Sequence, residues 1–162
     1  MSAGALHLLT GKIAAGKSTL SAKLAAETGG LVLAEDHWLP KLYPAQITSL
    51  EDYLRESVRF RAAIAPLIVD LLGRGMTVIL DFPANTVASR TWMRGLADAA
   101  GITATLHFLD LPDDLCRARL HTRNAAGTHA YQASDVEFDQ FTAHFVPPDA
   151  SEGFAIVRHA AS

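Results

Sequence analysis

The chain has 162 residues, of which 49% are hydrophobic and 19% charged, and its formal net charge is −3. These values predict one globular domain with a buried core, and they exclude the strongly basic overall charge that is typical of nucleic-acid-binding proteins. A single cysteine, Cys116, excludes a disulfide framework and a multi-cysteine metal site. The sequence has no apolar run of membrane-spanning length and no basic-then-apolar leader, so a cytoplasmic location is expected.

The first predicted element is a strand over Leu6–Thr10, and a helical pattern follows over residues 18–28. The loop between them fits G-x-x-x-x-G-K-[ST], the phosphate-binding P-loop, through Gly11, Gly16, Lys17 and Ser18. Because the motif is flanked by a strand and a helix, as a P-loop requires, it predicts that the chain binds a nucleoside triphosphate.

Each residue type in this loop has a chemical reason. Successive loop N–H groups form an anion-binding concavity, and the helix that follows directs its positive end at the same phosphates. Lys17 would reach the β- and γ-phosphates of ATP, the Ser18 hydroxyl would ligate Mg²⁺, and Thr19 would lie near the α-phosphate. The predicted nucleotide-binding residues in the loop are Gly11, Ala14, Ala15, Gly16, Lys17, Ser18 and Thr19.

Further along the chain, short apolar runs alternate with helical patterns. Strands are predicted over Leu31–Ala34, Met76–Leu80, Ile102–Leu109 and Phe154–Val157. Helices are predicted over residues 49–73 (with a kink at Pro66), Ser89–Ala100, Asp113–Arg123 and Ser134–Phe145, and a small lid over about 123–134. This alternation indicates a single α/β domain over residues 1–162, a three-layer sandwich with a five-stranded, mainly parallel sheet and the P-loop NTPase fold.

Ligands of such sheets bind at the carboxyl ends of the strands, so polar residues there are candidates for the site. The second strand runs into Glu35 and Asp36, and either carboxylate could take the proton of an attacking hydroxyl or hold a metal through water. Asp36 is the preferred base and Glu35 the alternative. His37 and Trp38 follow them and could line an acceptor pocket or belong to a structural turn and the core.

The third strand ends in Asp81 after four consecutive β-branched or aliphatic residues. This is the Walker B pattern, in which the aspartate holds Mg²⁺ or its water. The predicted metal-binding residues are therefore Ser18 and Asp81. The turn that follows, with Pro83, Asn85 and Thr86, could contact an acceptor.

Arg119 and Arg123 are four residues apart and share one face of the predicted helix before the lid. Guanidinium groups there would neutralise the charge of phosphoryl transfer as a lid closes, or would simply form a solvated basic face. Arg55 and Arg59 share a face of the long helix and could bind an anionic group of an acceptor. The seven histidines show no zinc-site spacing, and no nucleophile-elbow motif supports a hydrolase.

The segments GKIAAGKST, AEDHW, TVILDFPANT and LDLPDDLCRARLHTRN together resemble P-loop kinases of the nucleoside/nucleotide kinase-like group. The chain is most similar to the kinase domain of polynucleotide kinase, chloramphenicol phosphotransferase and zeta-toxin-like small kinases, a group often labelled AAA family ATPase. The resemblance implies that Lys17 and Ser18 contact ATP and Mg²⁺, and that Asp36 is the catalytic base. It also implies that Asp81 lies near the metal and that Arg119 and Arg123 are the lid arginines.

One departure from the AAA label bears on function. Asp81 is followed by Phe82 instead of glutamate, so the residue that activates water in motor ATPases is missing.

These observations predict an ATP-dependent phosphotransferase that moves the γ-phosphoryl of Mg-ATP to a hydroxyl of a small molecule, with Lys17, Asp36, Arg119 and Arg123 as catalytic residues. One alternative is a slowly hydrolysing or non-catalytic ATP-binding switch, such as a toxin-like regulatory protein. Another is a nucleic-acid 5′-hydroxyl kinase, although the acidic charge balance counts against a polynucleotide partner.

Overall fold

A computed structural model describes residues 3–127 and 132–160. Its centre is one five-stranded sheet in the order β2-β3-β1-β4-β5, and all four strand pairs are parallel. The strands are β1 (Ala5–Gly11), β2 (Leu31–Ala34), β3 (Thr77–Asp81), β4 (Thr105–Asp110) and β5 (Ala155–Ala160). The five predicted strands are confirmed, with their ends displaced by a few residues.

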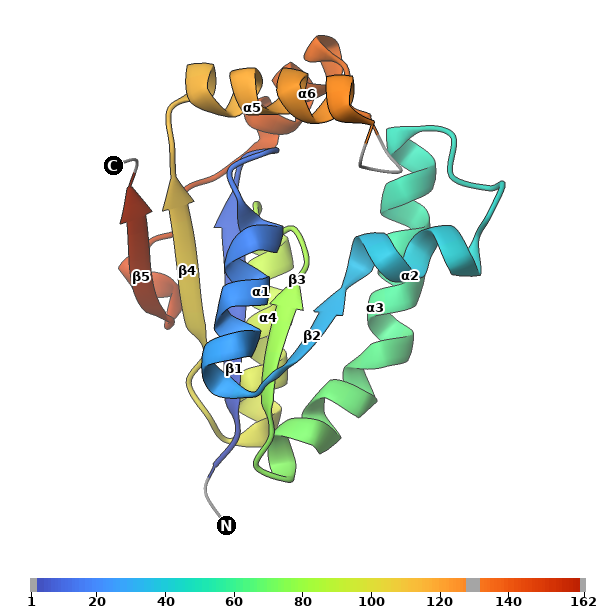
Figure 1. The fold of residues 1–162 in the computed structure, drawn as a ribbon. Helices are drawn as coiled ribbons and strands as arrows, with labels where there is room; N and C mark the ends of the chain where they lie inside the picture. The colour runs from blue at the N-terminus through green and yellow to red at the C-terminus, as the bar shows by residue number, and fades with distance from the viewer. Residues whose placement is uncertain (1–2, 128–131, 161–162) are drawn as a thin grey trace.

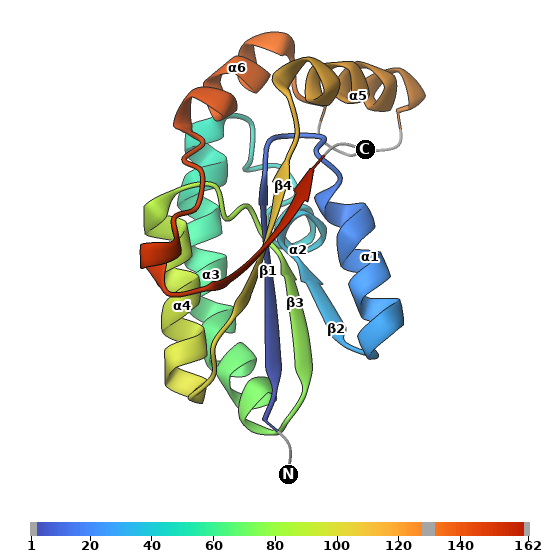
Figure 2. The same cartoon turned by 90° about the vertical axis from the view of Figure 1, so that its left-hand side faces the viewer.

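Helices cover both faces of the sheet, which confirms the three-layer prediction. They are α1 (Lys17–Thr28), α2 (Glu35–Leu42), α3 (Leu50–Gly73), α4 (Val87–Ala100), α5 (Asp113–Ala126) and α6 (Asp135–His144), with a 3₁₀ turn, η1, over Ala150–Glu152. In Figures 1 and 2, α1 lies on one face, α3 and α4 lie on the other, and α5 and α6 lie across the carboxyl ends of the strands. The nucleotide loop therefore lies beneath α5.

The sheet separates two apolar clusters because successive side chains of a strand point to opposite faces. Leu6 and Leu8 of β1 pack in the cluster that contains α3 and α4, whereas Leu9 packs with Leu109 and Cys116 beneath α1 and α5. All five side chains are less than 9% exposed. Continuous burial of this kind is expected for a parallel strand that is covered on both faces.

The helix α2 is the main element that the sequence did not predict. Pro40, Tyr43 and Pro44 indicate an irregular stretch, since proline within a helix removes a backbone hydrogen bond. In the structure Pro40 lies inside α2, and the short helix is held against α3 by the buried side chain of Leu39 and by the ring of Trp38, which lies 5.6 Å from that of Phe60. Tertiary packing thus outweighs the local cost of the proline.

Two predicted helix starts are confirmed in detail. Ser134 and Glu137 form a reciprocal capping box at the start of α6, and the Ser49 hydroxyl accepts a hydrogen bond from the Asp52 N–H at the start of α3. The helix α3 runs through Pro66 as one element. Of the predicted lid, residues 123–126 belong to α5, residues 128–131 lie outside the described part of the chain, and Ser134 caps α6.

The segment between α6 and β5 is fixed by Arg90 of α4, whose side chain is fully buried. Arg90 donates hydrogen bonds to the carbonyls of Ala84 and Val146 at 3.0 and 2.8 Å, and it forms an ion pair with Glu152 at 2.8 Å. A buried guanidinium is stable only when its charge and its N–H groups have partners, and these contacts supply them. Arg90 thereby ties the loop after β3 to the C-terminal part of the chain.

Candidate active site

The P-loop connects the carboxyl end of β1 to the first turn of α1, at the middle of the sheet. Gly16 has a φ of 103°, a conformation that side chains disfavour, and Ala14 also has a positive φ of 62°. A Cβ on Gly11 would lie only 3.2 Å from the side chains of Ala15 and Leu109. The glycines of the motif therefore satisfy two separate demands, a left-handed backbone at Gly16 and close packing at Gly11.

The amino end of α1 is suited to bind an anion. No side chain caps it, and within the described residues the N–H groups of Lys17, Ser18 and Thr19 donate no hydrogen bond. These groups and the positive end of the helix dipole point to the place where phosphates bind in P-loops. Nucleotide phosphates would give these donors the acceptors that they lack.

The side chain of Lys17 lies within the loop, where its Nζ donates to the carbonyls of Gly11 at 2.7 Å and Lys12 at 3.0 Å. Burial lowers the pKa of Lys17 to about 8, and the carboxylates of Asp81 and Asp36 oppose that shift. The ammonium is therefore poorly solvated and lies close to two carboxylates.

The two residues predicted to bind Mg²⁺, Ser18 and Asp81, contact each other. The Ser18 hydroxyl donates to Oδ2 of Asp81 at 2.9 Å, which brings the P-loop and the end of β3 together. A hydroxyl, one carboxylate and access to solvent fit Mg²⁺, which prefers oxygen ligands and keeps several of its waters. Among the described residues no three His, Cys, Asp or Glu side chains converge as a metal-binding group.

Asp36 lies in the first turn of α2, directly after β2, and its side chain reaches solvent. Its pKa is raised, first because the surrounding atoms partly desolvate it and then because Glu35 and Asp81 are nearby; Lys17 and Arg123 oppose the shift. These mutual effects place Asp36 in the same electrostatic cluster as Lys17, Asp81 and Arg123. A raised pKa makes a carboxylate a better proton acceptor near neutral pH.

Glu35, the alternative base, has a different environment. Its side chain is fully buried and forms an ion pair with Arg61 at 3.1 Å. The hydroxyls of Tyr53, at 3.2 Å, and Ser57 also donate to this carboxylate. With its lone pairs engaged and no exposure to solvent, Glu35 joins α2 to α3 and is not accessible to a substrate.

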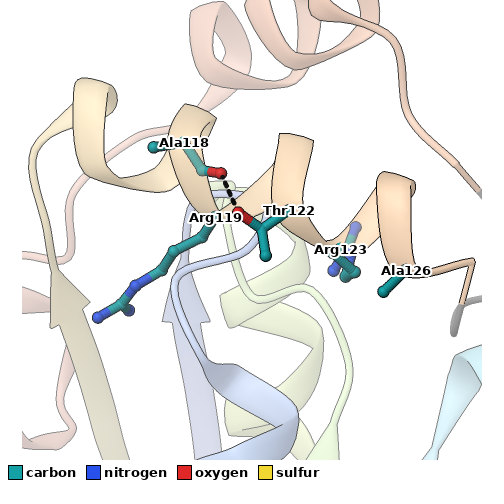
Figure 3. Close-up of a pocket in the computed structure, with 5 residues that line it drawn as sticks. All are labelled: Ala118, Arg119, Thr122, Arg123 and Ala126. Carbon is teal, nitrogen blue, oxygen red and sulfur yellow. Dashed lines mark hydrogen bonds between the residues drawn. The ribbon is translucent and has the colours of Figure 1, made fainter.

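The arginines of α5 separate into three environments. Ala118, Arg119, Thr122, Arg123 and Ala126 line an open pocket of about 400 Å³. Figure 3 shows Arg119 and Arg123 on the side of α5 that faces the P-loop, with their guanidinium groups directed apart. Burial lowers the pKa of Arg123, and the nearby carboxylate of Asp36 opposes this shift; Arg123 in turn helps to lower the pKa of Lys17.

Arg117 instead forms ion pairs with Asp135 and Asp139 of α6, so it fixes α6 against α5.

Three residues near the site have roles that the sequence did not predict. Asn85, which was considered for acceptor contact, instead accepts hydrogen bonds from Gly11 and Thr10, and Thr86 caps α4 through the Ser89 N–H. Arg61 forms the ion pair with Glu35 from 26 positions away. The polar turn after β3 was a signal for Asn85, but no local pattern distinguishes Arg61 from a surface arginine.

No helix in the described part of the chain combines the length and apolarity that crossing a bilayer requires.

Comparison with known proteins places this site in a familiar fold. A family model described as "AAA domain" matches residues 6–148. No curated protein sequence matches the chain.

Three solved structures are similar over most of the chain. A putative kinase from Chloroflexus aurantiacus is 20% identical, with a TM-score of 0.78 over 99% of this chain and 86% of that one. The Mycobacterium tuberculosis APS kinase CysC, in complex with AMPPNP and APS, is 21% identical, with a TM-score of 0.65 over 99% and 90%. A chain of the Pnkp1/Rnl/Hen1 RNA repair complex is 16% identical, with a TM-score of 0.67 over 89% and 44%. These likenesses show that the fold is that of P-loop kinases.

Proposed function

This chain belongs to the AAA-domain family whose model matches it, and from that premise we propose that it is an ATP-dependent phosphotransferase acting on a hydroxyl group. The observation that carries the proposal is the cluster of Lys17, Asp81, Asp36 and Arg123 at the carboxyl ends of the strands. It combines a phosphate-binding cation, a metal-binding carboxylate, a base with a raised pKa and a second cation. Phosphoryl transfer between ATP and an alcohol requires these groups.

In the proposed reaction, the acceptor oxygen forms a bond to the γ-phosphorus as the bond from that phosphorus to the bridging oxygen of ADP breaks. Asp36 receives the proton of the hydroxyl. Lys17 leaves the loop carbonyls and donates to the phosphates, while Arg123, together with Arg119, balances the negative charge that spreads over the γ-phosphoryl oxygens. Ser18 and Asp81 would hold Mg²⁺, which would neutralise negative charge on the phosphates of ATP.

The test is Mg²⁺-dependent ADP release with and without pools of hydroxylated metabolites and antibiotics. One pool should raise ADP release sharply, and Asp36→Asn should abolish that rise while ATP binding is retained. Asp70→Asn is a matched control, because Asp70 lies on the surface of α3 in an ion pair with Arg74. Unchanged turnover in Asp36→Asn would remove Asp36 from the role of base.

A nucleotide-binding switch is a second candidate, because a fully buried Phe82 follows Asp81 where motor ATPases have a water-activating glutamate. A switch would release ADP slowly, with no response to any pool or to Asp36→Asn.

A nucleic-acid 5′-hydroxyl kinase is a third candidate, because one similar structure comes from an RNA repair complex. Phosphorylation of a short 5′-hydroxyl oligonucleotide, with affinity that falls steeply as salt rises, would favour it.

A further inference from the structure

The surface formed by α2 and the first half of α3, residues 35–61, includes Asp36, and we name it the acceptor wall. Its arginines are all paired with carboxylates of the same wall. Arg55 contacts Asp52 at 2.9 Å and Glu56 at 3.0 Å, and Arg59 contacts Glu56 at 3.6 Å. None of these positive charges is left without a carboxylate beside it.

Arg61 is the most enclosed of the wall's arginines, with a side chain 14% exposed. Its Nε and one terminal nitrogen donate to Glu35, and further bonds reach the carbonyl of Pro83 at 3.4 Å and the Ser89 hydroxyl at 3.2 Å. Since a guanidinium has five N–H donors, these four bonds leave only one. Bidentate binding of a phosphate or carboxylate needs two adjacent N–H donors, so Arg61 cannot bind an acceptor anion in this way.

The rings of Phe82 and Trp92 further enclose Arg61, with centroids 5.6 and 5.5 Å from its guanidinium carbon. The two ring centroids are only 6.4 Å apart, so both rings lie toward the same side of the guanidinium, and Glu35 accepts hydrogen bonds from its edge. Both features fix Arg61 as part of the protein framework.

The net charge of the wall also disfavours binding of an anion. Its carboxylates are Glu35, Asp36, Glu51, Asp52 and Glu56, and its cations are Lys41, Arg55, Arg59 and Arg61. Lys41 is five residues beyond Asp36, about 140° around α2 from it. Arg119 and Arg123 of α5 form no ion pair within the described residues, and Arg123 lies close enough to Asp36 to affect its pKa. The proposed reaction assigns both arginines to the phosphates of ATP, so neither remains available to an acceptor.

We propose that the acceptor is an uncharged or amine-bearing alcohol without a phosphate, sulfate or carboxylate group. This inference rests on the proposed function and specifies the substrate class of that site. An anionic acceptor beside Asp36 and Asp81 would meet two carboxylates, while the arginines of the wall are paired and the proposed reaction assigns Lys17 and Arg123 to the phosphates of ATP. The repulsion would be strong where water is partly excluded. An uncharged alcohol or an amine avoids this repulsion.

The test uses the wild-type protein with Mg-ATP and sets of related acceptors that differ in charge. The panel contains glucose, glucosamine and gluconate; glycerol, serinol and glycerol 3-phosphate; and a nucleoside beside its 5′-monophosphate. In the set that supports turnover, kcat/KM for the uncharged or amine form should exceed that of the anion by tenfold or more. Turnover confined to the anions overturns this inference and leaves the phosphotransferase proposal standing, whereas ADP release that no acceptor raises overturns both.

A variant tests the role of the ion pair. Glu35→Gln keeps the shape of the side chain and releases the charge of Arg61, so the ratio of anion to uncharged turnover should rise at least fivefold. Arg74→Gln, which removes one partner of an exposed pair at the far end of α3, is the control and should leave the ratio unchanged. A folded Glu35→Gln protein, checked by circular dichroism, with an unaltered ratio would contradict the assignment of selectivity to Glu35 and Arg61.

Discussion

The side-chain oxygen of Asn85 accepts hydrogen bonds from the Gly11 N–H at 3.1 Å and from the Thr10 hydroxyl at 3.2 Å. The backbone carbonyl of Asn85 accepts a third bond from Val146 at 2.8 Å. Because the carbonyl of Gly11 in turn holds Lys17, the side chain and the backbone of Asn85 together connect the loop after β3 with the P-loop and the C-terminal segment. Asn85 therefore positions the first residue of the nucleotide site.

Asn85→Ala should weaken ATP binding. The substitution leaves the fully buried Thr10 hydroxyl and the Gly11 N–H without an acceptor, a loss of about 1–3 kcal/mol that corresponds to a rise of roughly 5- to 150-fold in the Kd for ATP where the loss falls on the nucleotide-binding conformation. Asn85→Asp keeps an acceptor oxygen and should restore most of the affinity. The measurement is isothermal titration calorimetry with a non-hydrolysable ATP analogue.

Thr86→Ala is the matched control for Asn85, since it removes the cap of α4 without touching the P-loop. It should lower stability by about 1 kcal/mol and leave the Kd unchanged. An equal loss of affinity in both variants would show that Asn85 acts only through general stability.

Asp81→Asn should raise the Mg²⁺ concentration needed for half-maximal activity by about tenfold or more, because it removes the only carboxylate that contacts Ser18 among the described residues. Nucleotide binding without metal should change less than twofold. The measurement is a Mg²⁺ titration of ADP release at saturating ATP. Asp110→Asn changes the corresponding carboxylate at the end of β4, which pairs with Arg158, and should leave the Mg²⁺ requirement unchanged.

ATP affinity should fall as pH rises above about 8, the pKa of Lys17 in the free protein. Phosphates bind the protonated ammonium, so at higher pH the protein must first take up a proton, and affinity should fall up to about tenfold per pH unit. Calorimetry at pH 8.5 in buffers of different ionisation enthalpy should detect this proton uptake. Lys17→Arg, which stays charged, should bind with little dependence on pH, and a constant wild-type Kd from pH 7 to 9 would contradict the prediction.

A row of histidines across β1, β4 and β5 should make the fold sensitive to acid. Nδ1 of His7 lies 3.0 Å from Nε2 of His107, and Nδ1 of His107 lies 3.0 Å from Nε2 of His159. Burial, with smaller contributions from the two neighbouring rings, lowers the pKa of His107 to about 4. Between pH 6.5 and 4 the unfolded chain therefore binds a proton that the folded chain does not, so stability falls as the pH falls.

Lowering the pKa of His107 from 6.5 to about 4 corresponds to a loss on the order of 3 kcal/mol in the free energy of unfolding once the pH is below both values. Solvent screens little of this loss, because His107 is only 6% exposed. Urea unfolding at pH 7 and pH 4.5 measures it. His107→Gln should flatten the dependence of stability on pH, whereas His144→Gln, at an exposed position, should not. The same slope in His107→Gln as in the wild type would show that other groups cause the acid sensitivity.

The sequence by itself determined the parts of the molecule that depend on near neighbours in the chain. The P-loop spacing, the five apolar strands and the capping box at Ser134 are all patterns within about ten residues, and all are present in the structure. Asp81 was found for the same reason, because the strand that ends in it is a continuous apolar run.

Only the tertiary structure decided which polar groups meet. Arg61 lies 26 positions from Glu35, Asn85 lies 74 from Gly11, and Arg90 lies 62 from Glu152. Such pairs form because the sheet brings distant strand ends together, and a buried charge is stable only where a partner is present. The same rule distinguishes Asp36 from Glu35, since two adjacent carboxylates with the same local sequence signal differ in what the fold places beside them.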